Sequence, residues 1–209
     1  MKVSLTDISQ QRIRQQGFLC STAIINKDMI LLNKVEKSVI LDNHNHPHAQ
    51  LGYCFNGNFD FEAEGNHFDM YKGQSFLLDG EVFHSAVATT DYYPMDIKVM
   101  LKEDVLAHRM ASNVFEETIN TTEYLIKKAS IGSYHVQSIT YFKCATVDIK
   151  LDINRKHFVV VSTSCSFHVH GLLSSLNMKP MKIYQLEIDR LQFGITPDIK
   201  DVEILFITY

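Results

Sequence analysis

Hydrophobic and polar residues alternate with a period of two through much of the first hundred positions. The clearest case is the segment 50–55, in which every second side chain is a large hydrophobic one. This alternation is typical of β-strands, whose successive side chains point to opposite faces of a sheet. We therefore expect Leu51, Tyr53 and Phe55 on one face of a strand and Gln50, Gly52 and Cys54 on the other.

Turn-forming residues divide this region into short strands. Asn56-Gly57-Asn58 and Glu64-Gly65-Asn66 flank a strand that contains Phe59 and Phe61, and Gly73 marks a third turn. Strands at a spacing of about eight to twelve residues predict a β-sandwich or barrel. Further strands are expected at 29–35, 38–46 and 96–101.

The pattern changes after Leu101. Residues 103–130 contain good helix formers and no glycine or proline. Thr121 or Thr122 is suited to cap a helix, and lysines near Lys128 suit its carboxyl end. This segment is expected to be a helical connector.

After Gly132 the β pattern returns and continues to the end of the chain. We therefore predict an all-β protein with two barrels joined by a helical connector. The expected parts are a metal-binding barrel at 1–102, the connector at 103–130 and a second, degenerate barrel-like β domain at 131–209. Two β-rich halves of similar size suggest that one barrel has been duplicated. Strands of the second half are expected at 139–149, 157–163, 167–173, 181–188, 191–195 and 202–208.

Composition narrows the class of partner. The formal net charge is -4 and the lysines and arginines are scattered, so no basic patch for nucleic acid is indicated. No apolar run of about 18 residues exists that would predict a membrane span, and the amino terminus lacks the apolar core of a signal peptide. Four widely spaced cysteines (Cys20, Cys54, Cys144 and Cys165) favour reduced thiols. These features predict a cytoplasmic protein with no nucleic-acid or membrane partner.

A cluster of histidines carries the candidate chemistry. His44, His46 and Gln50 are closely spaced at the entry to a strand, and His84 comes from a later strand. Neutral imidazoles with one oxygen donor suit a catalytic Fe, Mn, Co, Ni or Zn ion. His48 lies within reach and could replace His46, but Pro47 breaks the strand alternation, so we expect His48 beside the ligands.

The spacing of this cluster resembles the cupin family. His44-x-His46-(x)3-Gln50-(x)6-Gly57 matches the first cupin motif, with Gln where Glu is usual. Gly73, followed eleven residues later by His84, matches the interval of the second motif, although Asp79-Gly80-Glu81 replaces its usual Pro and Gly. The resemblance covers residues 25–101 and implies a small β-barrel that holds one divalent metal through His44, His46, Gln50 and His84.

Within the cupins, the sequence around these motifs is similar to the bicupin isomerases of bacilysin biosynthesis and to small cupins that rearrange unsaturated uronates. Both groups have Gln among the ligands. The second half of the chain departs from the bicupin pattern. It offers His168-Val-His170, but Ser174 stands where Gln or Glu is expected, and no further histidine follows His170. We therefore expect one intact metal site.

The ligand set favours a Lewis-acid reaction. Three imidazoles and a carboxamide leave the ion its full positive charge, which attracts an anionic substrate and stabilises a developing enolate. This favours isomerisation, tautomerisation or cyclisation of a small keto or hydroxy acid. The resemblance to the bacilysin isomerases implies a biosynthetic tailoring step. His48 and Glu81 are candidates for the base that moves a proton. Tyr53 and Phe83 are candidates for the substrate cavity.

Other readings stay open at this stage. The same fold supports Fe(II)-dependent dioxygenases, and cupin barrels also serve as ligand-sensing modules of transcription factors or as metal-free structural barrels. Exposed strand edges need covering, so a homodimer is expected.

Overall fold

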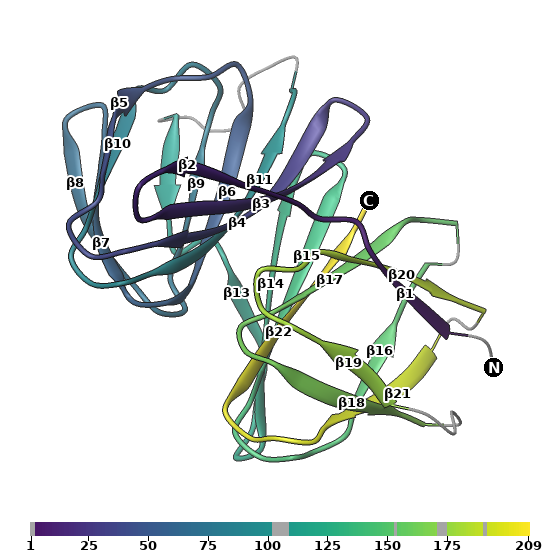
Figure 1. The fold of residues 1–209 in the computed structure, drawn as a ribbon. Helices are drawn as coiled ribbons and strands as arrows, with labels where there is room; N and C mark the ends of the chain where they lie inside the picture. Colours follow the sequence, from purple (N-terminus) through teal and green to yellow (C-terminus); the bar gives the residue numbers. More distant parts are fainter. Residues whose placement is uncertain (1–2, 102–108, 153, 171–174, 190–191) are drawn as a thin grey trace. The chain divides into compact units, whose positions relative to one another are not determined.

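The computed structural model of the chain describes residues 3–101, 109–152, 154–170, 175–189 and 192–209. Within these residues the regular elements are 22 β-strands, which confirms the predicted all-β class (Figure 1). The chain forms two compact units. The N-terminal unit is Gln10–Phe115, and the C-terminal unit combines Met1–Ser9 with Glu116–Tyr209.

The N-terminal unit contains one large and one small antiparallel sheet. The large sheet has the order β12-β9-β6-β11-β4-β3-β2, and the small sheet has the order β5-β10-β7-β8. The bounds of these strands are β2 Gln10–Gln15, β3 Phe18–Ile25, β4 Asp28–Val35, β5 Ile40–His44, β6 Ala49–Asn56, β7 Asn58–Ala63, β8 Asn66–Tyr71, β9 Ser75–Leu78, β10 His84–Ala88, β11 Tyr93–Val99 and β12 Met110–Ser112.

The C-terminal unit is built in the same way. Its large sheet has the order β1-β20-β17-β22-β15-β14-β13, and its small sheet has the order β16-β21-β18-β19. The bounds of these strands are β1 Val3–Asp7, β13 Glu116–Asn120, β14 Tyr124–Ile131, β15 Tyr134–Tyr141, β16 Val147–Lys150, β17 His157–Val161, β18 Cys165–Val169, β19 Ser175–Met178, β20 Tyr184–Ile188, β21 Gln192–Pro197 and β22 Val202–Thr208.

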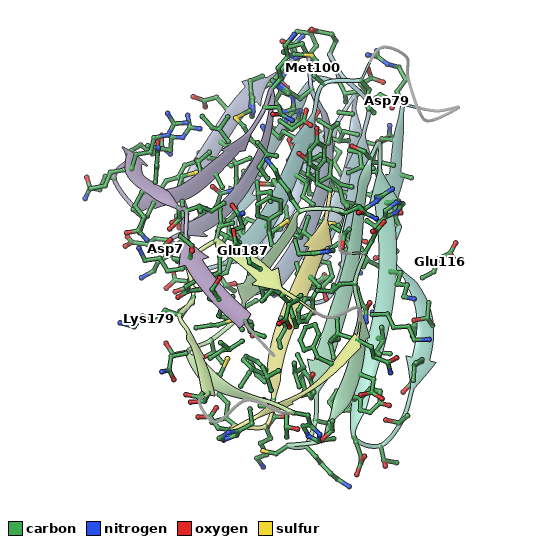
Figure 2. The ribbon with its side chains drawn as sticks, turned by 90° about the vertical axis from the view of Figure 1, so that its right-hand side faces the viewer. Asp7, Asp79, Met100, Glu116, Lys179 and Glu187 are labelled. Atoms are coloured by element: carbon green, nitrogen blue, oxygen red, sulfur yellow. The ribbon has the colours of Figure 1, made fainter. Side chains whose placement is uncertain are left out.

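The two units share one strand order. Each strand from β1 to β11 corresponds to the strand that comes eleven places later in the chain, as duplication of one barrel predicts. The first strand of each series lies in the sheet of the other series, because β1 pairs with β20 and β12 pairs with β9. Figure 2 shows β1, marked by Asp7, beside the strand that carries Glu187.

Turns and close packing in the N-terminal unit follow from a few residues. Glu64 and Gly65 both have positive φ (49° and 79°), which is the geometry of the two-residue turn that joins β7 to β8. Gly52 lies under the ring of Phe76, where an added Cβ would come within 2.2 Å of the ring carbons. Phe76 in turn stacks on Phe61 at 4.5 Å. Glycine at position 52 therefore makes room for an aromatic core between the sheets.

The predicted helical connector is wrong for the described residues 109–130; residues 103–108 of the prediction lie outside the described part. This stretch forms β12, β13 and most of β14. The hydroxyl of Thr121 does accept backbone N–H groups, as a helix cap would, but these belong to Glu123 and Tyr124 in the turn between β13 and β14. Pairing of β14 with both β13 and β15, and burial of Ile126, override the local helix preference.

The compact units also divide the chain differently from the expected boundaries. The connector belongs partly to each unit, and Met1–Ser9 joins the C-terminal unit. The expected strand at 139–149 is two strands, β15 and β16, and the strand expected at 38–46 ends at His44. The amino-terminal residues, to which no strand was assigned, form β1, β2 and β3.

Candidate metal centre

Four predicted ligands lie between the two sheets of the N-terminal unit. His44 ends β5 and His84 begins β10, and the two are paired residues of the small sheet. Gln50 belongs to β6 of the large sheet, and His46 lies in the connection from β5 to β6. The turn after Asp79, labelled in Figure 2, contacts that connection, because the Glu81 N–H donates to the His46 carbonyl oxygen at 2.8 Å.

The three histidine rings converge. Each of His44, His46 and His84 offers one ligand nitrogen, and these nitrogens all lie within 4.8 Å of one another. The ring centroid of His84 is 4.4 Å from that of His44 and 5.0 Å from that of His46. Within the described part of the chain, this is the one group of three such residues able to hold a metal ion.

Backbone carbonyl groups fix the orientation of each ring. The Nδ1 atoms of His44, His46 and His84 lie 2.8–2.9 Å from the carbonyl oxygens of Asp42, His48 and Val82 respectively. A carbonyl oxygen only accepts, so each Nδ1 must carry the hydrogen. In a neutral imidazole the lone pair then lies on Nε2. All three rings are thus set in the tautomer that offers Nε2 to a metal.

Burial keeps two of the rings neutral. Burial, followed by the positive charge of Lys98, lowers the pKa of His46 to about 4. Burial also lowers the pKa of His84 to about 4, with a contribution from the neighbouring histidines. Both imidazoles are therefore unprotonated at neutral pH and available as ligands.

A buried pair of polar residues orients Gln50. Its Nε2 donates to Asp96 Oδ1 at 2.9 Å, and Asn33 Nδ2 donates to the other oxygen of Asp96, also at 2.9 Å. All three side chains are buried. Burial raises the pKa of Asp96, while the charge of Lys98 and the two amide donors oppose that shift. Because the amide nitrogen of Gln50 faces Asp96, its carbonyl oxygen Oε1 must face the histidines.

The contact between Gln50 and His46 is the one that indicates a cation. Gln50 Oε1 lies 2.9 Å from His46 Nε2, yet both atoms are acceptors in the states set by their other partners. Two ligands at right angles on one ion, each about 2.0–2.2 Å from it, stand roughly 3 Å apart. The donor set of His44, His46, Gln50 and His84 therefore fits a single divalent transition metal.

A cavity of about 530 Å³ adjoins this centre, within the size range of small-molecule sites. His44, His46, Gln50 and His84 all line it. The rest of its wall combines aromatic side chains with a few charged ones. The aromatic residues are Phe18, Phe59, Phe61, Phe76 and Tyr92, and the charged residues are Arg14, Asp42, Asp96 and Lys98.

Comparison with known proteins identifies the fold. The sequence matches no protein-family profile and no curated protein sequence. In structure, the chain is similar to YhhW from Escherichia coli, with a TM-score of 0.73 and 12% identity over 99% of this chain and 97% of that one. It is also similar to quercetin 2,3-dioxygenase from Acinetobacter baumannii (TM-score 0.71, 11% identity, 99% and 78% of the two chains). A third similar structure is Bacillus subtilis oxalate decarboxylase, an enzyme with Mn(II) centres (TM-score 0.66, 10% identity over 98% of this chain and 76% of that one).

The chain has the cupin fold. This confirms the fold that the two histidine motifs predicted, and the cupin barrel of the N-terminal unit contains all four predicted ligands. The particular comparison with bacilysin isomerases stays a prediction.

The other predicted site residues lie away from the cavity of this cupin barrel. The ring of His48 is 3.4 Å from the carbonyl oxygen of Lys27, and the Glu81 carboxylate accepts from Asn45 at 3.1 Å; neither residue lines the cavity. Tyr53 packs on Phe55 and Phe115, on the face of β6 opposite to Gln50. Phe83 is half exposed and does not line the cavity.

In the second cupin barrel, the two histidines of the motif His168-Val-His170 are exposed. On β18, Cys165, Phe167 and Val169 are buried in the apolar core, whereas His168 and His170 are exposed. The counterparts of β6 and β11, which are β17 and β22, contribute mainly apolar side chains to that core. Ser174 lies outside the described residues.

Sequence reasoning missed the residues that support the ligands. Asp96 and Lys98 occupy alternate positions of β11, and the period-two pattern of this strand was sufficient to place both on one face. Their position beside Gln50 depends on the pairing of β11 with β6, and the partner Asn33 comes from β4. No local spacing in the sequence reports these contacts.

Proposed function

We propose that the N-terminal barrel is the active site of a metal-dependent cupin enzyme. Its substrate is a small anionic keto or hydroxy acid, and its reaction is an isomerisation or tautomerisation. The observation that carries the proposal is the convergence of three Nε2 lone pairs with the side-chain oxygen of Gln50. That oxygen faces the histidines and lies 2.9 Å from His46 Nε2.

A bound divalent ion would supply a Lewis acid that polarises a carbonyl or hydroxyl group of the substrate. The ligands determine how much of the ion's positive charge reaches the substrate. Gln50 is a neutral ligand, so it removes none of the charge that the ion presents to the cavity. Asp96 holds the Gln50 amide in place, and the aromatic wall of the cavity excludes water from the carbon skeleton of a ligand.

The proton-moving group is a separate question. His48 and Glu81 were the predicted bases, but neither lines the cavity; the ring of His48 is directed to the Lys27 carbonyl oxygen, and the Glu81 carboxylate accepts from Asn45. The proposal therefore assigns no step to either residue. Substitution of each by alanine, with activity as the readout, tests these two predictions.

Metal content is the first test. After incubation with Mn(II), Fe(II), Co(II), Ni(II) or Zn(II) and removal of excess ion, elemental analysis is expected to give one equivalent per chain. His84→Ala is expected to lose that metal, whereas His67→Ala, an exposed histidine on β8, is expected to retain it. Circular dichroism of both variants checks that they are folded. Full occupancy in a folded His84→Ala variant would contradict the ligand assignment.

The reaction class is tested by hydrogen exchange into a substrate. A panel of 2-keto acids is incubated anaerobically in D2O with the metal-loaded protein, and exchange at the carbon next to the carbonyl is followed by NMR. We expect exchange or isomerisation that needs the metal and no oxygen.

Oxygen use would favour the alternative reaction. The similarity in fold to a quercetin 2,3-dioxygenase supports an Fe(II)-dependent dioxygenase as the second candidate. Oxygen consumption by the Fe(II)-loaded protein, with no anaerobic exchange, would favour it. Metal and acid binding with neither reaction would instead indicate a ligand-sensing module.

The open edge of the large sheet supports the predicted homodimer. β2 forms this edge, and all six of its residues are exposed. A strand at the edge of a sheet can pair with a strand of another chain. Light scattering is expected to give twice the chain mass of 24.0 kDa; the mass of a single chain would contradict the dimer.

A further inference from the structure

Two cationic side chains line the cavity beside the candidate metal centre. Lys98 is a half-buried residue of β11, and Arg14 lies near the end of β2. The neighbouring Gln15 donates its Nε2 to the Ile40 carbonyl oxygen at 3.1 Å, which ties the end of β2 to β5 in the other sheet. This contact holds the residue next to Arg14 against the small sheet.

Neither cation forms an ion pair with a described residue of the protein. Among the described residues, no carboxylate lies within ion-pair distance of Arg14 or Lys98. The nearest candidate is Asp96, whose two oxygens accept the amide hydrogens of Gln50 and Asn33. The other acidic residue of the cavity, Asp42, is exposed on β5. The wall therefore carries two cations that form no ion pair with the protein, together with the carboxyl groups of Asp42 and Asp96.

The two cations also repel each other. Burial lowers the pKa of Lys98, and the positive charge of Arg14 lowers it further, against the attraction of Asp96. Asp96 offsets this repulsion at Lys98, and an anion that lay near both cations would offset it at Arg14 as well. Arg and Lys beside each other are also well suited to bind a carboxylate through charge-assisted hydrogen bonds.

The same cavity also has an aromatic wall. Phe59 stacks on Tyr92 and Phe61 stacks on Phe76, each pair at 4.5 Å, and all four rings line the same cavity as the histidines. A ligand that used all three features would need two anionic ends and an apolar middle.

We propose that the cavity takes an acid with two anionic groups joined by an apolar carbon skeleton, one directed to the histidine cluster and the other bound by Arg14 and Lys98. The role of the first group depends on the proposed function. The binding of the second group depends only on Arg14 and Lys98.

Matched ligands test the second anionic group. Phenylpyruvate, 4-carboxyphenylpyruvate and the methyl ester of the ring carboxylate share one keto acid, and only the second has two negative charges. Calorimetric titration of the Zn(II)-loaded protein is expected to show the dianion binding roughly tenfold more tightly than the ester. Equal affinities for the dianion and its ester would overturn the inference while leaving the proposed metal enzyme intact.

Substitutions locate the effect. Arg14→Gln and Lys98→Met are each expected to remove most of the difference in affinity between dianion and ester, and Arg14→Gln is expected to do so with zinc content unchanged. Arg12→Gln on β2 and Lys34→Met on β4 are matched controls that do not line the cavity and are expected to keep the difference. Arg14 is exposed, so its variant is expected to fold even if Lys98→Met does not. A preference for the dianion that survives Arg14→Gln would overturn the assignment.

A metal-free titration separates the two proposals. If the protein takes up no metal, the proposed function fails, and benzene-1,4-dicarboxylate is titrated against the metal-free wild type and the Arg14→Gln variant. Binding that is weakened by Arg14→Gln supports the cation pair independently of the metal. Binding that is absent, or equal in both proteins, overturns it.

Discussion

At the scale of single residues, the orientation of Gln50 determines what the site can bind. An amide can present either its oxygen or its nitrogen, and Asp96 selects the oxygen by accepting from the nitrogen at 2.9 Å. The histidines are oriented in the same way, each through Nδ1 and a backbone carbonyl group. Contacts behind the ligands thus prepare the metal site.

Replacing Gln50 by glutamate tests this orientation. Gln50→Glu exchanges an N–H donor for an oxygen, which brings the new carboxylate into contact with the carboxylate of Asp96. Since both are buried, we expect the metal-free variant to lose about 1–3 kcal/mol of unfolding free energy. Asp96→Asn in the same chain restores a donor, and the double variant is expected to recover most of the loss. Urea unfolding of the two single variants and the double variant measures this coupling; additive losses would contradict it.

Asp96 alone is expected to affect metal affinity. Asp96→Asn weakens the acceptor that holds the Gln50 amide, and loss of such a supporting contact typically lowers metal affinity by about 10- to 100-fold. Competition with a chelator measures the Zn(II) dissociation constant. Asp69→Asn, an exposed residue on β8, is the control. Unchanged affinity in Asp96→Asn would show that the amide does not need this anchor.

The candidate ligands were predictable from the sequence because they are marked by spacing. His44, His46, Gln50 and His84 stand at motif intervals, and the structure brings all four together. The residues that hold these ligands in place have no such spacing. Asp96 reaches Gln50 through the pairing of β11 with β6, and Asn33 reaches Asp96 through the pairing of β4 with β11. His48 was close in sequence to the ligands, but its ring points toward the carbonyl of Lys27.

At the scale of elements, alternation predicted strands well and local helix preference misled. The strand from Asp28 to Val35 and the turn at Glu64–Gly65 follow directly from the sequence pattern. Residues 109–130 contain no helix-breaking residue, yet pairing across three strands and burial of Ile126 determine their conformation. Composition of a short segment does not report on such distant partners.

Thr121 distinguishes the observed turn from the predicted helix. Its hydroxyl accepts the N–H groups of Glu123 and Tyr124 and donates to the Tyr124 carbonyl oxygen at 3.0 Å. Thr121→Ala removes these bonds and is expected to lower the unfolding free energy by about 0.5–1.5 kcal/mol. The adjacent exposed Thr122 is the matched control, and its change to alanine is expected to have a smaller effect. Equal losses in urea unfolding would contradict the role of Thr121.

At the scale of the whole molecule, one strand order serves two different interiors. The N-terminal unit keeps a polar cluster and a cavity between its sheets, while the corresponding strands of the C-terminal unit fill theirs with residues such as Phe167, Phe193 and Phe206. The repeated order of strands was suggested by two β-rich halves. The pairing of β1 with β20 and of β12 with β9 was not predictable. It depends on which sheet edge is open to the short first strand of each series.

The difference between the interiors predicts where metal stabilises the molecule. A ligand that binds only the folded state stabilises it by about 2.7 kcal/mol at a free concentration 100 times its dissociation constant. That stabilisation applies first to the elements that hold the ligand. We therefore expect Zn(II) to slow amide hydrogen exchange in β5, β6 and β10.

The counterparts β16, β17 and β21 provide an internal control, because they occupy the same places in the sheets of the C-terminal unit. Hydrogen-exchange mass spectrometry with and without Zn(II) compares the two sets of strands in one chain. Protection confined to the N-terminal set, and lost in His84→Ala, is the expected result. Equal protection of both sets would mean that the ion acts through general binding to the protein and not through the histidine cluster. The comparison thus tests the metal centre through its effect on the surrounding strands, without knowledge of the substrate.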